Sequence, residues 1–209
     1  MNEFFLYLQL GFDHITDPNG YDHIIFIIAL CAIYQLKDWR KVLILVTAFT
    51  LGHSVTLALA TLNYIQYRTE VIEFLIPVTI LLTAFTNIFQ KTYPDSLFIE
   101  DVPQNPVPRY LMALFFGLIH GMGFSNYLRS LLGREASILK PLLAFNLGLE
   151  LGQLLIVLII LTISWILISV FKVRKHDWKL ILSGAVAGIA LILIKESDYW
   201  QELMGHVPE

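Results

Sequence analysis

The chain has 209 residues, of which 56% are hydrophobic and only 15% are charged, whereas a soluble domain averages about 25% charged residues. The formal net charge of −3 argues against a nucleic-acid partner, and the single cysteine, Cys31, excludes an intrachain disulfide and a metal site made of several thiolates. The composition therefore predicts an integral membrane protein with a single transmembrane domain over residues 1–209.

Six segments are read as membrane-spanning helices, which need about 20 mostly apolar residues each. In chain order these segments are 21–36, 41–63, 71–90, 109–132, 138–171 and 178–196. The first is short for a span, and the amphipathic stretch before it is expected to lie on the outer surface or to dip into the membrane. The predicted fold is an all-α polytopic membrane bundle of about six transmembrane helices with a short N-terminal amphipathic or re-entrant segment.

Positive charges in two loops predict the orientation of the spans. These charges follow the first and the fifth span, at Lys37, Arg40 and Lys41 and at Lys172, Arg174, Lys175 and Lys179. Loops rich in Lys and Arg remain on the cytoplasmic side, and six spans place both of these loops there, with both termini outside. The N-terminal stretch lacks a basic region, so no cleaved signal peptide is expected. We expect a multi-pass protein of a bacterial-type cytoplasmic (inner) membrane.

Polar and ionisable side chains interrupt the apolar segments, at Asp22, His23, His53, His120, Asn146, Glu150 and Gln153. A charged side chain at the centre of a membrane helix costs at least ~2.5–3.5 kcal/mol, so such residues usually face a protein interior and mark a pathway or a site. In the predicted orientation they lie at mid-membrane or in its outer half, with His14 at the outer mouth. We expect them to converge on one cavity that opens to the exterior.

Several imidazoles together with carboxylates form a ligand set suited to a divalent transition metal such as nickel, cobalt or zinc. The predicted metal ligands are His14, Asp22, His23, His53, His120 and Glu150. Asn146, Gln153 and Ser54 are expected to support them. Other interpretations remain open at this point. Asp22 can cap a helix N-terminus, and a single histidine can hydrogen-bond a neighbouring carbonyl.

One face of the fifth predicted span carries Asn146, Glu150 and Gln153, at positions i, i+4 and i+7. The amides suit a polar seam that joins two helices by hydrogen bonds, but a carboxylate at that depth requires a cation, a proton or a metal. The segment 13–23 holds three Asp and two His residues, which predicts either a cation funnel or a solvated turn. Small residues four apart predict close helix packing, at Gly117/Gly121, Gly148/Gly152 and Gly184/Gly188.

Four stretches in order resemble the HupE/UreJ family of small membrane proteins. They are Gly11–Ile15 leading to Asp22-His23-Ile24, then Phe49–Leu57, Phe116–Phe124 and Phe145–Gln153. The Asp-His-Ile and Leu-Gly-His-Ser pieces are also similar to nickel/cobalt permeases, although His14 lies too far before Asp22-His23 for the His-x4-Asp-His signature of those permeases. The resemblance implies nickel or cobalt handling alongside hydrogenase and urease systems.

Three functions fit the residues. The first is a nickel/cobalt-type permease with a metal ion and the lipid bilayer as partners, and with a homo-oligomer left open. The second is an intramembrane zinc-dependent hydrolase, in which Glu150 and Ser54, or Ser125, assist a metal-bound water. The third is a metal-delivery partner of an enzyme-maturation system. An enzyme is the less favoured interpretation, because no G-x-S-x-G or H-E-x-x-H motif occurs.

Overall fold

The computed structural model describes residues 2–90, 105–132 and 138–205, and within these ranges the chain forms helices and no strands. The α-helices are α1 (Glu3–Thr16), α2 (Asp22–Cys31), α3 (Trp39–Thr61), α4 (Thr69–Phe89), α5 (Val107–Gly123), α6 (Ser125–Leu132), α7 (Leu139–Trp165), α8 (Lys175–Glu196) and α9 (Asp198–Leu203). A short 3-10 turn, η1 (Leu36–Asp38), precedes α3, and a π-helical turn, η2 (Ile166–Val170), extends α7. The predicted all-α fold is confirmed.

Four helical segments within the described residues are long and apolar enough to cross a bilayer, namely Leu36–Thr61, Thr69–Phe89, Leu139–Val170 and Lys175–Glu196. The helices α5 and α6 meet at a bend of 47° and together can form a fifth span. The chain is therefore a multi-pass membrane protein, with four or five candidate spans where the sequence suggested about six.

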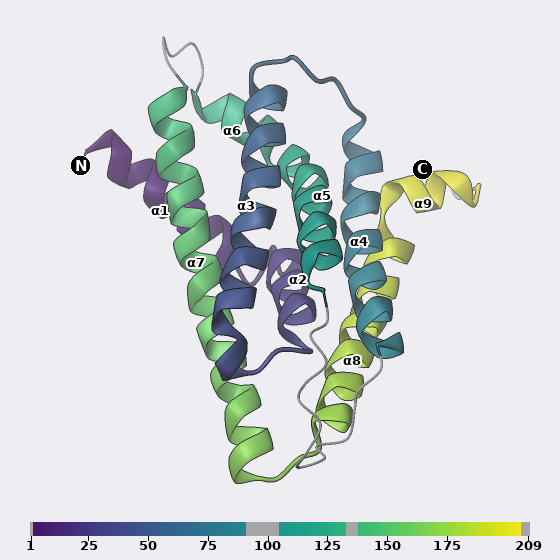
Figure 1. Cartoon of the computed structure of the whole chain (residues 1–209). Coiled ribbons are helices and arrows are strands. Elements are labelled where there is room, and N and C mark those ends of the chain that lie inside the picture. Colours follow the sequence, from purple (N-terminus) through teal and green to yellow (C-terminus); the bar gives the residue numbers. More distant parts are fainter. Residues whose placement is uncertain (1, 91–104, 133–137, 206–209) are drawn as a thin grey trace.

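The difference lies in the segment 21–36, which was expected to be the first span. Its α-helix, α2, has ten residues and is about 15 Å long, half the thickness of a bilayer core of about 30 Å. The chain turns after α2, where the backbone N–H of Gln35 donates to the Asp38 carboxylate at 3.2 Å and η1 begins. The short helix lies in the middle of the bundle, packed against α4 and α7 (Figure 1).

Two hydrogen bonds hold the C-terminal end of α2 in place. The Asn87 side chain on α4 donates from Nδ2 to the Ala29 carbonyl oxygen at 2.7 Å. The Arg109 guanidinium on α5 donates to Asn87 Oδ1 at 3.0 Å. Because α2 is too short to be placed by the bilayer alone, these contacts and its packing determine where its first residues, Asp22 and His23, lie.

The helices α1 and α7 approach one another closely enough that their backbones touch at glycine. A Cβ atom on Gly148 would lie 1.8 Å from the Leu8 carbonyl oxygen, and one on Gly11 would lie 1.9 Å from that of Phe145. The same is true of α3 and α5, where a Cβ atom on Gly121 would lie 2.2 Å from the His53 carbonyl oxygen. Any larger residue would separate these helices, so the predicted packing role of the small residues holds here.

The glycines of α8 behave differently. A Cβ atom on Gly184 or Gly188 would meet nothing within 4 Å in the described part of the chain. Close packing of these two glycines against another helix of the same chain is therefore not found, and the physical reason is their position on the outer face of the bundle, where both are exposed.

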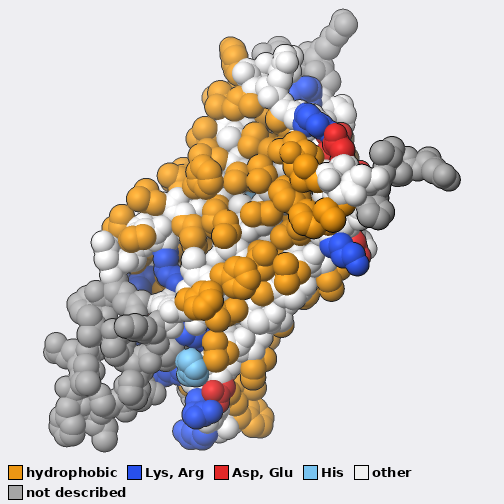
Figure 2. Space-filling view, turned by 90° about the vertical axis from the view of Figure 1, so that its right-hand side faces the viewer, with side chains coloured by type: hydrophobic (Ala, Val, Ile, Leu, Met, Phe, Trp, Pro, Cys, Tyr) orange, Lys and Arg blue, Asp and Glu red, His pale blue; other side chains and the backbone are white. Residues whose placement is uncertain are grey.

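The surface of the bundle fits a lipid environment. Figure 2 shows a face on which hydrophobic side chains cover most of the middle, while Lys, Arg, Asp and Glu lie mainly toward the ends. Large apolar side chains are exposed at mid-helix, for example Leu51 at 58% and Leu158 at 58%. Exposed apolar area of this extent is expected of a surface in contact with hydrocarbon rather than water.

Candidate metal centre

Four histidines from four helices converge inside the bundle. His14 lies in the last turn of α1, His23 in the first turn of α2, His53 near the middle of α3, and His120 near the end of α5. The ring centroids of His14 and His23 are 4.7 Å apart, those of His23 and His120 are 5.3 Å apart, and those of His23 and His53 are 6.3 Å apart. The predicted convergence of the histidines is therefore present in the structure, with His23 at its centre.

Ring nitrogens of the four histidines and a carboxylate oxygen of Asp22 form two groups, each of which could hold a metal ion. In the first, His14, His23 and His53 each present a ligand atom within 4.8 Å of the others. In the second, Asp22, His23 and His120 do the same. His23 belongs to both groups, so the two positions are adjacent and linked through one imidazole.

Several ring nitrogens of this cluster have no hydrogen-bond partner among the described residues, although they are buried. They are His14 Nε2, His23 Nε2, both nitrogens of His53, and His120 Nδ1. The side chains of His53 and His120 are fully buried. A buried polar atom without a partner is destabilising, and native structures pair nearly all such atoms. A set of lone-pair donors in one place is the arrangement that a bound cation would satisfy.

The two ring nitrogens of His23 and of His120 have different surroundings. The Asp22 carboxylate lies 3.1 Å from His23 Nδ1, so it orients the ring, and Nε2 is buried without a hydrogen-bond partner among the described residues. The Thr79 hydroxyl on α4 lies 2.9 Å from His120 Nε2, and Nδ1 has no hydrogen-bond partner within the residues that the structure describes. Thr79 was not singled out in the sequence, because an isolated threonine in an apolar helix is common and only its packing reveals the contact.

An apolar shell surrounds the imidazoles. The Phe26 ring lies 4.9 Å from that of His120, the Phe124 ring lies 4.0 Å from that of His14, and the Phe145 ring stacks with that of His53 at 6.5 Å. These rings shield the fully buried His53 and His120 from the surface. Such a shell strengthens the interaction between a cation and its ligands, because the local dielectric constant is low.

The amides and the carboxylate of α7 lie along the seam with α3. Gln153 accepts a hydrogen bond from Thr50 at 2.8 Å, and Glu150 accepts one from Thr47 at 2.7 Å. Asn146 donates to the Leu142 carbonyl at 2.9 Å, and its Oδ1 lies beside His53, buried and without a hydrogen-bond partner by distance and angle among the described residues. Glu150 thus belongs to neither group of ligand atoms around the histidines, whereas Asn146 borders them.

The hydroxyls considered for a hydrolase take part in local hydrogen bonds. Ser54 donates to the Thr50 carbonyl one turn earlier at 2.7 Å. Ser125 is fully buried and makes a short hydrogen bond with the Tyr67 hydroxyl. Both groups contribute to helix packing, and neither arrangement by itself favours a nucleophile.

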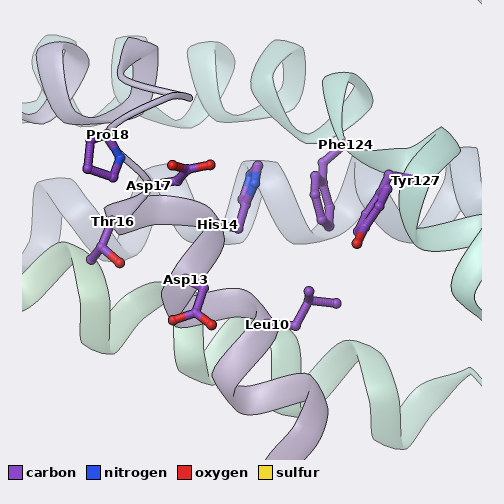
Figure 3. Close-up of a pocket in the computed structure, with 8 residues that line it drawn as sticks. All are labelled: Leu10, Asp13, His14, Thr16, Asp17, Pro18, Phe124 and Tyr127. Carbon is purple, nitrogen blue, oxygen red and sulfur yellow. The ribbon is translucent and has the colours of Figure 1, made fainter.

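A cavity of about 400 Å³ leads from the surface to His14. Figure 3 shows the His14 ring between the carboxylates of Asp13 and Asp17 on one side and the ring of Phe124 on the other. His14 lines this cavity and also belongs to the first group of metal-ligand atoms. The acidic segment 13–23 therefore borders an opening that ends at the histidine cluster.

The chain has no match among curated proteins and none among solved structures. A family model described as HupE / UreJ protein matches residues 1–200, which is nearly the whole chain. On this match the chain belongs to the HupE/UreJ family.

Proposed function

We propose that this protein binds a divalent transition metal ion inside the membrane and moves it across. The observation that carries the proposal is the buried cluster of His14, His23, His53 and His120, in which every ring has at least one nitrogen without a hydrogen-bond partner in the described part of the chain. The HupE/UreJ family is linked to nickel and cobalt transport and to urease maturation, which fits this ligand chemistry.

Nickel or cobalt is the cargo that we propose, from the link of the family to these metals together with the ligand chemistry. Neutral imidazole binds nickel, cobalt and zinc well, whereas Cu(I) prefers thiolate and thioether ligands. The only cysteine, Cys31, is buried at the far end of α2 from Asp22 and His23. The affinities of divalent metals for a given site follow one general order, so affinity alone does not set the choice between nickel, cobalt and zinc. That choice depends on the coordination geometry of the site and on which metal is available.

The path of the ion runs from the acidic opening toward the other end of the bundle. Asp13 and Asp17 attract a cation to the cavity, and His14 passes it to the position shared with His23 and His53. His23 then connects this position to the one with Asp22 and His120. Beyond the histidines, the oxygens of Glu150 and Gln153 line the α3–α7 seam and serve as weaker ligands along the way.

We also propose that the acidic opening faces the outside of a cytoplasmic membrane. The start of α3, the end of α7 and the start of α8 lie at the same end of the bundle (Figure 1). Around this end are the basic residues Lys37, Arg40, Lys41, Lys172, Arg174 and Lys175. Basic residues next to spans remain on the cytoplasmic side, so the opening at His14, nearer the other end, faces outward and both termini are external.

The test is metal content and uptake in matched variants. Purified wild-type protein is expected to hold nickel or cobalt at near-stoichiometric level by elemental analysis, and cells expressing it are expected to accumulate the ion. The His53→Ala variant should lose both properties, whereas His176→Ala, at the start of α8 and far from the cluster, should retain them. Equal metal content and uptake in wild type and His53→Ala would refute the proposal. Binding without uptake would favour metal delivery to a partner instead.

A further inference from the structure

We propose that Thr79 is a positioning residue that fixes which nitrogen of His120 binds the metal. This inference rests on the proposed function, because it names the ligand atom and the residue that selects it. Thr79 belongs to α4, and none of the four clustered histidines comes from that helix. Its hydroxyl lies 2.9 Å from His120 Nε2, and both side chains are buried, Thr79 at 2% exposure and His120 at 0%.

The single hydrogen of the Thr79 hydroxyl decides the direction of this contact. Thr79 Oγ1 lies 2.7 Å from the Ile76 carbonyl oxygen of the preceding turn, and a carbonyl can only accept. The hydroxyl therefore donates to Ile76, and its oxygen accepts a hydrogen bond from His120 Nε2–H. A neutral imidazole carries one ring hydrogen, so Nδ1 of His120 is left with a lone pair.

The burial of His120 Nδ1 agrees with this assignment. Nδ1 has no hydrogen-bond partner among the described residues. A hydrogen on Nδ1 would be a buried donor without an acceptor, which is costly, whereas a lone pair there can bind a cation. His120 also belongs, with Asp22 and His23, to one of the groups that could hold a metal ion.

In His23 the two ring nitrogens have the opposite roles. There the Asp22 carboxylate lies against Nδ1, so Nδ1 carries the hydrogen and Nε2 is the free ligand atom. His23 and His120 thus leave different ring nitrogens without a hydrogen-bond partner among the described residues, and in each ring the other nitrogen lies against an oxygen. Residues that orient metal-binding imidazoles in this way commonly change metal affinity by about 10–100-fold when they are removed.

The test uses three variants of the full-length protein in lipid bilayers. Thr79→Val removes the hydroxyl and keeps the shape, and Thr79→Ser keeps a hydroxyl that can bond both partners. Thr83→Val is the matched control, since its hydroxyl donates only to the Thr79 carbonyl at 2.8 Å, one turn away. The readouts are the tautomer of His120 in metal-free protein by ¹⁵N NMR, assigned with His120→Gln, and the affinity for Co²⁺.

In wild type, Thr79→Ser and Thr83→Val, the ring hydrogen of His120 is expected on Nε2. In Thr79→Val the hydrogen is no longer expected to favour Nε2 over Nδ1. Affinity for Co²⁺ should fall about 10–100-fold in Thr79→Val and remain near wild type in the other two variants. Hydrogen on Nδ1 in the wild type, or equal affinities in Thr79→Val and Thr83→Val, would overturn the inference. If wild type binds no Co²⁺, the proposed function fails, and the NMR spectra alone decide whether Thr79 sets the tautomer.

Discussion

The Glu150 carboxylate on α7 accepts a hydrogen bond from the Thr47 hydroxyl on α3 at 2.7 Å, and this pair lies apart from the two groups of ligand atoms around the histidines. Thr47 precedes His53 by six residues on α3, which corresponds to about 9 Å along the helix axis. In the proposed function, metal binding and metal movement therefore involve different residues, with the ion held by the imidazoles and Glu150 placed further along the path.

The first prediction concerns Glu150→Gln. The variant should retain metal binding, because Glu150 belongs to neither group of ligand atoms, but its uptake should fall to the level of His53→Ala, because the path loses its negative charge. The measurements are Co²⁺ affinity of the purified protein and nickel uptake by cells. If Glu150→Gln lost metal binding as completely as His53→Ala, Glu150 would have to be counted among the direct ligands.

A second prediction follows from the 3.1 Å contact between Asp22 and His23. Asp22→Asn removes the negative charge that orients the His23 ring, so metal affinity should fall by about 10–100-fold. Asp177→Asn is the control, since Asp177 pairs with Arg174 at the exposed start of α8. Isothermal titration with Co²⁺ compares the two. Equal affinities would show that the carboxylate does not act on the site.

A third prediction concerns the acidic opening. Asp13→Asn should raise the nickel concentration needed for half-maximal uptake without changing the affinity of the purified site, because Asp13 lines the cavity but belongs to neither ligand group. The effect should shrink at high ionic strength, since salt screens the attraction of exposed charges. Uptake assays at low and high salt measure both quantities, and a change that is independent of salt would argue against electrostatic attraction.

A fourth prediction concerns the packing of α1 on α7. Gly148→Ala places a methyl group where the Leu8 carbonyl oxygen lies, so α1 must move away and carry His14 with it. Thermal stability in detergent and metal affinity should both decrease. Gly188→Ala is the matched control, because nothing lies within 4 Å of its added methyl group among the described residues, and alanine favours a helix over glycine. Similar losses in both variants would contradict the role of this contact.

The sequence by itself determined the class of protein, the approximate positions of the long helices and the identity of the chemically capable residues. Hydrocarbon requires long, continuous apolar helices, so the spans containing His53, His120 and Glu150 are visible as local patterns. The same solvent makes each polar interruption costly, which is why the histidines stood out before their positions were known. The order of the four motifs was also sufficient to identify the family.

Only the tertiary structure decided which of these residues meet. It showed that the helix beginning at Asp22 has ten residues, that His14 reaches the cluster from α1, and that Glu150 pairs with Thr47 instead of joining the imidazoles. It also revealed the contact between Thr79 and His120, which no local sequence pattern predicts. The physical reason is that distances between helices depend on close backbone contacts such as that between Gly148 and Leu8, and these join residues far apart in the chain.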